Sequence, residues 1–267
     1  DLVSTDKVPY SKVMGKLLFS KSEISNWISG GKNNMSNPKN PPNILLGSHD
    51  PLLELAVKQS KSGIAMSFDG SVEGLERFKL NHGIASGLHI YDSDLETWNV
   101  PIVKKCLEKQ DFVLMEWAKR DRGLIYKPKE KSKKNSIYEF IGQRLVTRQS
   151  GSGSDNYFKY ICKRENINSS DFIGTEVTYT ENDAVSLILS DNADVTLGLA
   201  SEAKKHQLEF LHIATERFDI VVNRISWFEK PFQRLLNFSR SDDFLNTASN
   251  FFGYNINDLG TVHFNNK

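Results

Sequence analysis

The sequence predicts an α/β protein with two lobes, and two observations lead to this prediction. From Asn43 onward, short apolar strands alternate with helical patterns, which is typical of βαβ units and of a mainly parallel sheet. After a second series of this kind, the apolar run Phe218–Val222 can return the chain to the first half of the fold. Two lobes joined by two crossings would leave a cleft lined by loops from both.

The bulk composition narrows the class of protein. The chain has 267 residues, 39% of them hydrophobic, and a formal net charge of +1. This suits one large bilobed domain or two smaller ones, and it excludes a uniformly basic surface while allowing a local basic patch. Cys106 and Cys162 lie in apolar patterns, so we expect buried free thiols and a reducing compartment. No apolar run approaches the roughly 20 residues that a membrane span needs, so we expect no membrane partner.

Residues 1–31 differ from the rest of the chain. Tyr10–Phe19 predicts two short strands around a glycine-containing turn, and Ser20–Glu23 has the S-x-x-E form of a helix capping box. A hairpin and one short helix cannot bury a core alone. We therefore expect this segment to be the end of a small domain.

A linker follows that segment, and the segment has more basic than acidic residues. Residues 32–42 are rich in Asn, Pro and Lys, a composition typical of linkers, and they separate residues 1–31 from a domain at 43–267. Residues 1–40 contain six lysines and three acidic residues. Lys12 and Lys16 on the hairpin are candidates for contacts with DNA phosphates, and a merely solvated hairpin is the alternative.

In the predicted first lobe, strands end at small polar residues. Ile44–Leu46, Ile64–Met66 and Gly83–Tyr91 are the apolar strand candidates. In open α/β sheets, ligands bind beyond the carboxyl ends of the strands. The residues at or near these ends are Ser48, Gly70, Ser71 and His89.

The second half repeats the pattern. We place the first lobe at about 43–117 and 218–267, and the second lobe at about 118–217. The elements expected are a strand at Phe112–Trp117 leading into the charged run Lys119–Gly123, helices at Ile137–Ile141, Ser154–Arg164, Trp227–Ser239 and Asp242–Phe251, and strands at Leu145–Thr147, Glu176–Tyr179, Val195–Leu199 and Phe210–Ile213.

A serine- and glycine-rich loop precedes one of these helices. Glycine lets the backbone approach a ligand closely, the first amides of a helix lack internal partners, and the helix dipole favours an anion there. A cradle for an anion or polar ligand and a simple helix cap are both open on these residues. The candidates are Arg148, Ser150, Gly151, Ser152, Gly153 and Ser154.

Several motifs keep a familiar order along the chain: GSHDPLLEL, GSVEGLERF, GLHIYD, RLVTRQSGSGSDNYF and FFGYNINDLG. With these motifs, Asn43–Asn265 resembles the molybdate-binding-like branch of the type II periplasmic-binding-protein fold. The segment VPYSKVMGKLLFSKSEISNWI resembles the wing and last helix of excisionase/MerR-like winged helix-turn-helix domains, of which only the second half is present. Together they imply a cytoplasmic one-component transcriptional regulator that binds DNA, acts as a homodimer and needs no cofactor.

The resemblance also implies where a ligand binds. Ser48 and Ser71 match first-lobe positions that offer a hydroxyl and an amide to an oxyanion such as molybdate or tungstate, held by neutral hydrogen bonds and helix N-termini. The loop Ser150–Ser154 and a helix start match the second-lobe positions. Ionisable residues beside these positions depart from the family pattern. If both Asp50 and Glu181 face the ligand, they repel a dianion and favour a polar or cationic organic ligand. These further candidates are His49, Asp50, Thr180, Glu181, Asn182 and Asp183.

Two other functions were weighed. An enzyme is disfavoured because the adjacent residues Ser48, His49 and Asp50 cannot converge as a catalytic triad, and neither a G-x-S-x-G elbow nor a phosphate-binding P-loop motif is present. We therefore expect no catalytic residues, and the scattered histidines predict no metal site. The alternative function is a secreted solute-binding protein of a transporter. A first residue of Asp1 fits either a processed secretory protein or a fragment.

Overall fold

The computed structural model describes residues 11–13, 16–18, 41–128 and 133–265. The chain divides into two units, residues 1–39 and residues 40–267. In the first unit, β1 (Ser11–Val13) and β2 (Lys16–Leu18) pair antiparallel. This confirms the predicted hairpin and places Lys12 and Lys16 on its two strands. The helix expected after Ser20 lies outside the described residues.

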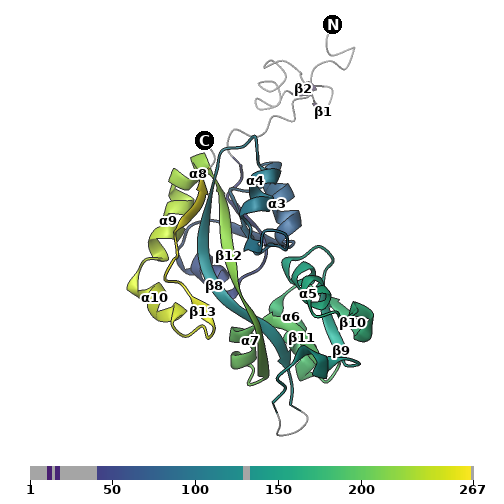
Figure 1. Ribbon diagram of the computed structural model, residues 1–267. Helices are drawn as coiled ribbons and strands as arrows, with labels where there is room; N and C mark the ends of the chain where they lie inside the picture. The colour runs from purple at the N-terminus through teal and green to yellow at the C-terminus, as the bar shows by residue number, and fades with distance from the viewer. Residues whose placement is uncertain (1–10, 14–15, 19–40, 129–132, 266–267) are drawn as a thin grey trace. The chain divides into compact units, whose positions relative to one another are not determined.

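The second unit is built on one mixed sheet (Figure 1), which has ten strands within the described residues. The strands are β3 (Ile44–Gly47), β4 (Ala65–Phe68), β5 (Ala85–Leu88), β8 (Phe112–Tyr126), β9 (Arg144–Arg148), β10 (Ile173–Thr178), β11 (Val195–Leu199), β12 (Glu209–Asn223), β13 (Tyr254–Asn255) and β14 (Val262–Asn265). Their order is β10-β9-β11-β8-β12-β5-β3-β4, with β13 and β14 added along β8.

The direction of pairing divides this sheet into three parts. β3 pairs parallel with β4 and β5, and β9 pairs parallel with β10 and β11. Between these groups, β8 and β12 pair antiparallel with each other and with their neighbours. The predicted α/β fold is confirmed, but the sheet is mixed rather than mainly parallel. We call the β3–β5 side the first lobe and the β9–β11 side the second lobe.

Two long strands cross between the lobes. β8 and β12 are each 15 residues long and pair from Phe112 opposite Asn223 to Tyr126 opposite Glu209. The register of β12 shifts twice, between His212 and Ala214 and between Phe218 and Asp219. The predicted strands Phe112–Trp117 and Phe210–Ile213 are shorter than the observed ones, and the apolar run Phe218–Val222 belongs to β12 as well. These predictions fell short because charged residues interrupt the apolar pattern at the middle of both strands.

Helices cover both faces of each lobe. They are α2 (Pro51–Gln59), α3 (Ser71–Lys79), α4 (Val100–Cys106), α5 (Gly153–Arg164), α6 (Glu181–Leu189), α7 (Ala200–Lys205), α8 (Arg224–Phe228), α9 (Lys230–Phe238) and α10 (Asp242–Ala248). Neighbouring residues of one strand serve opposite cores, as strand geometry requires. Leu45 packs in the cluster that contains residues of α2, α9 and α10, whereas Leu46 packs in the cluster that contains residues of α3 and α4.

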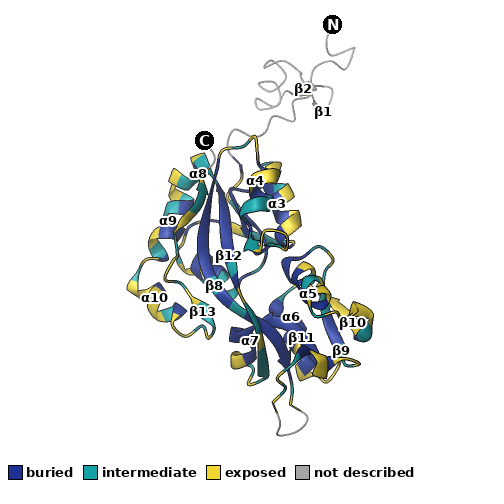
Figure 2. Cartoon of the chain, in the orientation of Figure 1, coloured by how far each residue is buried: buried dark blue, intermediate teal, exposed yellow. Residues whose placement is uncertain are grey.

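The second lobe repeats this arrangement. Leu124 joins the cluster formed with α5, and Ile125 joins the one formed with α6 and α7. Figure 2 shows that β8 is buried along most of its length and β12 mainly in its second half, while the helices expose their outer faces. The four clusters therefore fix the strand ends that face each other between the lobes.

Three predicted elements differ from those observed. The helix expected at Ile137–Ile141 is a 3-10 turn at Ile137–Phe140. The helix expected at Trp227–Ser239 is split into α8 and α9, because Glu229 is extended and Pro231 begins a new helix. The strand expected at Gly83–Tyr91 stops at Leu88, and a separate small ribbon pairs β6 (Tyr91–Asp92) with β7 (Thr97–Trp98).

Membrane crossing was assessed for the described residues. None of the helices in this part of the chain has the length and apolar character that a bilayer span requires.

Candidate functional site

A small pocket lies between the two lobes, at the carboxyl ends of their parallel strands. Its free volume is about 10 Å³, roughly the space of one water molecule. A ligand with several non-hydrogen atoms therefore requires the two lobes to move apart. The lining residues are Ser48, His49, Phe68, Gly70 and His89 from the first lobe, and Arg148, Gln149, Ser152, Ser154, Tyr179 and Glu181 from the second.

The structure brings together half of the sequence candidates. Ser71 lies directly behind the wall, where its Oγ is 2.7 Å from Ser48 Oγ and accepts a hydrogen bond from the backbone amide of His89 at 3.1 Å. Thr180 caps α6 through Asp183, and Gly153 packs against the first lobe. The candidates that do not line the pocket are Asp50, Ser71, Ser150, Gly151, Gly153, Thr180, Asn182 and Asp183.

The N-termini of three helices reach the pocket. α3 starts after Gly70, α5 after Ser152 and α6 at Glu181, and each of these residues lines it. Gly70 has a φ of 95° and gives α3 no side-chain cap, so the first amides of α3 keep their donors for another partner. Each helix N-terminus carries a partial positive charge, so these three helix ends favour an anionic group in the pocket.

The lobes touch beside the pocket. A Cβ atom added to Gly153 would lie 2.5 Å from the carbonyl oxygen of His89, and one added to Gly70 would lie 3.4 Å from Gln149 Nε2. Distances below 3.0 Å are not compatible with a side chain at position 153. The glycine therefore allows the lobes to close.

Arg148 is the positive side chain in the wall. The side chain is 9% exposed, and its Nη2 donates to the carbonyl oxygen of Tyr179 at 2.7 Å. Among the described residues, Nε and Nη1 have no hydrogen-bond partner. Nη1 lies 3.1 Å from Glu181 Oε1 as an ion pair, but the two groups are not aligned for a hydrogen bond. Two buried N–H donors of Arg148 are thus left for a ligand.

Two histidines of the first lobe are oriented by carboxylates. His49 Nε2 lies 2.8 Å from Glu54 Oε2, and His89 Nδ1 lies 3.0 Å from Glu216 Oε2. Burial lowers the pKa of His89, although Glu216 opposes this effect. A neutral ring that donates one N–H to a carboxylate offers its other nitrogen as an acceptor.

A buried charged network lies behind the pocket, and the sequence analysis missed it. Arg120 and Arg122 of β8 both donate to Glu216 of β12. Arg122 also reaches the second lobe, where it donates to Ser154 Oγ at 3.0 Å and to Glu181 Oε1 at 3.1 Å. The spacing of Arg120 and Arg122 could have indicated this network, because side chains two residues apart on a strand point to the same face.

Asp50 belongs to this network rather than to the ligand site. One oxygen accepts from the amide of Leu53, capping α2, and from Trp117 Nε1, while the other accepts from Arg120 and from the hydroxyl of Tyr254. Asp50 was predicted as a ligand contact, but it does not line the pocket. Its carboxylate is saturated by donors from distant parts of the chain.

The charges around the pocket balance. Arg120, Arg122 and Arg148 stand against three carboxylates, those of Asp50, Glu181 and Glu216. Burial alone would raise the pKa of Glu181, but Arg122 and then Arg148 lower it to about 2. Glu216 likewise has a pKa well below its usual range, because Arg120 and Arg122 outweigh the effect of burial. Both glutamates are ionised and act only as acceptors.

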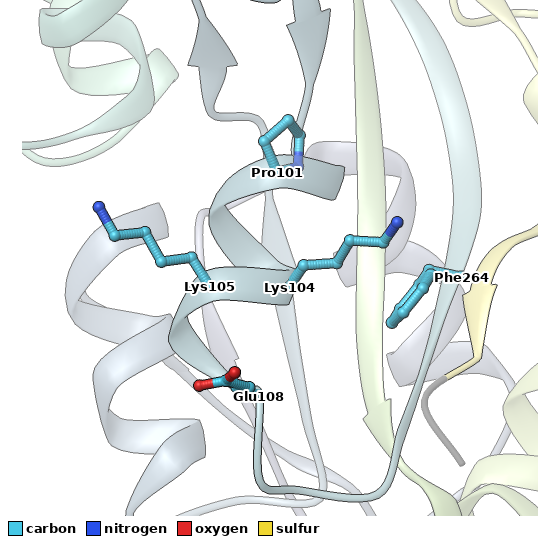
Figure 3. Close-up of a pocket in the computed structure, with 5 residues that line it drawn as sticks. All are labelled: Pro101, Lys104, Lys105, Glu108 and Phe264. Atoms are coloured by element: carbon cyan, nitrogen blue, oxygen red, sulfur yellow. The ribbon is translucent and has the colours of Figure 1, made fainter.

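Other clusters in the described residues do not form a comparable site. Glu116, Asp219 and His263 have a spacing that a metal ion could bridge, but Arg217 already donates to Asp219 at 2.9–3.0 Å. A larger pocket lies on the first lobe alone, where Lys104 points to the ring of Phe264 and Lys105 points away (Figure 3). Its lysines are exposed on one side of α4, whereas the interlobe pocket contains buried donors without partners.

Comparisons with known proteins agree with this geometry. A family model described as "PBP superfamily domain" matches residues 52–240. The uncharacterized protein YvgK of Bacillus subtilis (strain 168) is 26% identical over 235 residues, which cover 84% of this chain and 75% of YvgK.

Two solved structures show the same fold at low identity. One is a putative phosphate ABC transporter substrate-binding protein with bound phosphate from Clostridium perfringens, with a TM-score of 0.55, 13% identity, and coverage of 77% of this chain and 96% of that one. The other is the effector binding domain of QuiR in complex with shikimate, with a TM-score of 0.50, 12% identity, and coverage of 73% and 92%.

Proposed function

The chain belongs to the PBP superfamily, and we propose that its second unit binds a small oxyanion, or a metabolite that carries one, in the interlobe pocket. The observation on which this proposal rests is the set of donors aimed at one small space. Three helix N-termini reach this space, and Arg148 adds two buried nitrogens, Nε and Nη1, that donate no hydrogen bond to any described residue. Buried donors without partners are rare in native proteins and costly unless a ligand or water satisfies them.

We further propose that this unit is the sensor of a transcriptional regulator. Support comes from the antiparallel hairpin β1–β2, from the resemblance of its sequence to the wing of winged helix-turn-helix domains, and from the lysines on both strands. The effector binding domain of QuiR has the same fold and binds shikimate. In this proposal a ligand shifts the population towards the closed state, and a dimer then presents its N-terminal units differently to DNA.

A transport function is the second candidate. It is favoured by the likeness in fold to a putative phosphate ABC transporter substrate-binding protein. Binding of the ligand is common to both functions, so it does not separate them. Ligand-dependent binding of the complete gene product to DNA does separate them, because only the regulator requires it.

The first experiment is a thermal-shift titration of this chain with molybdate, tungstate, phosphate and sulfate, followed by calorimetry. A ligand that binds only the folded state raises the melting temperature with its concentration. We expect at least one oxyanion to do so, and Arg148→Gln to abolish the shift. Arg144→Gln is the matched control, because Arg144 lies on the same strand but pairs with Asp194 at the surface. A shift unchanged in the Arg148 variant would contradict the assignment of the pocket.

A further inference from the structure

We infer that the ligand is an anion that also carries a hydrogen-bond donor, namely a hydroxyl or ammonium group. This inference rests on the proposed function and narrows its ligand class. It follows from the acceptors of the pocket, which stand beside the donors described above. A fully deprotonated tetraoxo anion such as molybdate, tungstate or sulfate has acceptors only.

His49 is the first of these acceptors. Glu54 is ionised, because its hydrogen bonds to Lys58 and His49 lower its pKa, so the proton shared at 2.8 Å belongs to His49 Nε2. In the neutral ring, Nδ1 then carries a lone pair. Nδ1 is buried, has no hydrogen-bond partner within the part of the chain that the structure describes, and belongs to a residue that lines the pocket.

Glu181 is the second acceptor. Its Oε1 accepts from Arg122 at 3.1 Å, whereas its Oε2 accepts no hydrogen bond from any described residue. The residue is 4% exposed and lines the pocket. Glu181 comes from the second lobe and His49 from the first, so each lobe contributes one residue with an acceptor to the lining.

Donors and acceptors together decide between ligand classes. The amides of α3 and the free N–H groups of Arg148 suit the negative oxygens of a ligand, whereas His49 Nδ1 and Glu181 Oε2 suit an O–H or N–H group. An anion that has only acceptors would place its lone pairs against His49 Nδ1 and Glu181 Oε2, and these two atoms would stay without a donor. Sites built to bind a hydroxyl discriminate strongly against analogues that lack it.

The test uses pairs of ligands that match in size and charge. At mildly alkaline pH the hydrogen phosphate dianion carries one hydroxyl and sulfate carries none, and lactate differs from propionate in the same way. Alanine, compared with propionate, provides the ammonium arm, and this pair matches in size but not in net charge. In calorimetric titrations of the full chain we expect the donor-bearing member of at least one pair to bind about tenfold more tightly or better, since an unpaired buried polar group is costly. The pair that responds distinguishes an inorganic from an organic source.

A variant tests whether Glu181 causes the discrimination. Glu181→Gln replaces one acceptor oxygen by an amide donor, so the ratio within the responding pair should fall to about threefold or less. Glu202→Gln is the control, because Glu202 is equally buried at 4% but lies on α7 outside the pocket. If Glu181→Gln does not fold, His49→Phe removes the other acceptor and gives the same readout.

The outcomes separate the two proposals. Equal or tighter binding of sulfate, molybdate or tungstate would overturn the inference on ligand class and leave the oxyanion site standing. An affinity ratio within the responding pair that is unchanged in the Glu181 and His49 variants would also overturn the inference on ligand class and leave the oxyanion site standing. Binding of no anion of either kind would overturn the proposed function itself, and the inference with it.

Discussion

Gly153 at the start of α5 lies against His89, the residue that follows β5 in the first lobe. A Cβ on Gly153 would be 2.5 Å from the carbonyl oxygen of His89, so there is no room for a methyl group between them. The contact joins the two lobes directly beside the pocket. It gives the closed state a requirement that can be tested without touching any residue in the pocket wall.

Gly153→Ala should weaken ligand binding about tenfold or more, because the added methyl group holds the lobes apart. Its effect on the stability of the free protein should be small, since alanine is a better helix former than glycine. Calorimetric titration measures the affinity. Gly174→Ala is the control, because a Cβ there meets nothing within 4 Å. Wild-type affinity in the Gly153 variant would show that closure does not depend on this contact.

Ser152→Ala combined with Ser71→Ala should reduce the rise in melting temperature caused by the ligand. Ser152 lines the pocket and caps α5, and Ser71 supports Ser48 from behind. Loss of the cap alone destabilises by about 1 kcal/mol. Ser241→Ala removes the corresponding cap of α10 and controls for this loss. The control should melt earlier but keep the full ligand-induced shift, and an equal shift in the double variant would argue against the site.

Stability should fall as the pH drops below about 6.5. Burial lowers the pKa of His89 in the folded state, so the unfolded chain takes up a proton there that the folded chain does not. The slope is limited to about 1.4 kcal/mol per pH unit for one proton. Glu181 adds a further loss at lower pH, between its ordinary pKa and about 2.

Urea unfolding between mildly alkaline and mildly acidic pH measures this slope. In His89→Gln the amide can still donate to Glu216, but it does not titrate, so the dependence on pH should flatten in that interval. An identical slope in the variant and the wild type would exclude His89 as its source.

Lys12→Ala combined with Lys16→Ala should weaken binding to duplex DNA and make it less dependent on salt. Each phosphate contact contributes about 0.9 to the slope of log affinity against log salt, so losing two contacts should reduce it by about 1.8. Fluorescence anisotropy at several salt concentrations provides the measurement. Lys204→Ala with Lys205→Ala changes the same net charge on α7 of the second unit and should leave the slope unchanged. If both double variants behave alike, the hairpin is not a DNA contact.

Where local patterns decide the structure, the sequence was sufficient. Ser48 and Ser152 were predicted to lie at one cleft, and they line one pocket. Each follows a parallel-paired strand of its own lobe, β3 or β9, and ligands bind beyond the carboxyl ends of such strands. The helix caps at Ser152 and Thr180 were also readable, since a cap depends on residues three positions apart.

Where partners are distant, the sequence was not sufficient. Asp50 looked like a ligand contact because it stands beside Ser48, but its partners Arg120 and Tyr254 are 70 and 204 positions away. The same cause hid the length of β8 and β12. Arg120 and Glu216 resemble loop residues in isolation and become compatible with a buried strand only when they neutralise each other.

The crossing of the lobes has a consequence for how they separate. Both connections are strands of one hydrogen-bonded ribbon, and β12 is irregular at His212–Ala214 and Phe218–Asp219, on either side of the buried charges. Irregular positions in a ladder bend more easily than regular ones. We therefore expect any separation of the lobes to bend the ribbon at these two positions, on either side of the ion pairs between Glu216 and the arginines of β8.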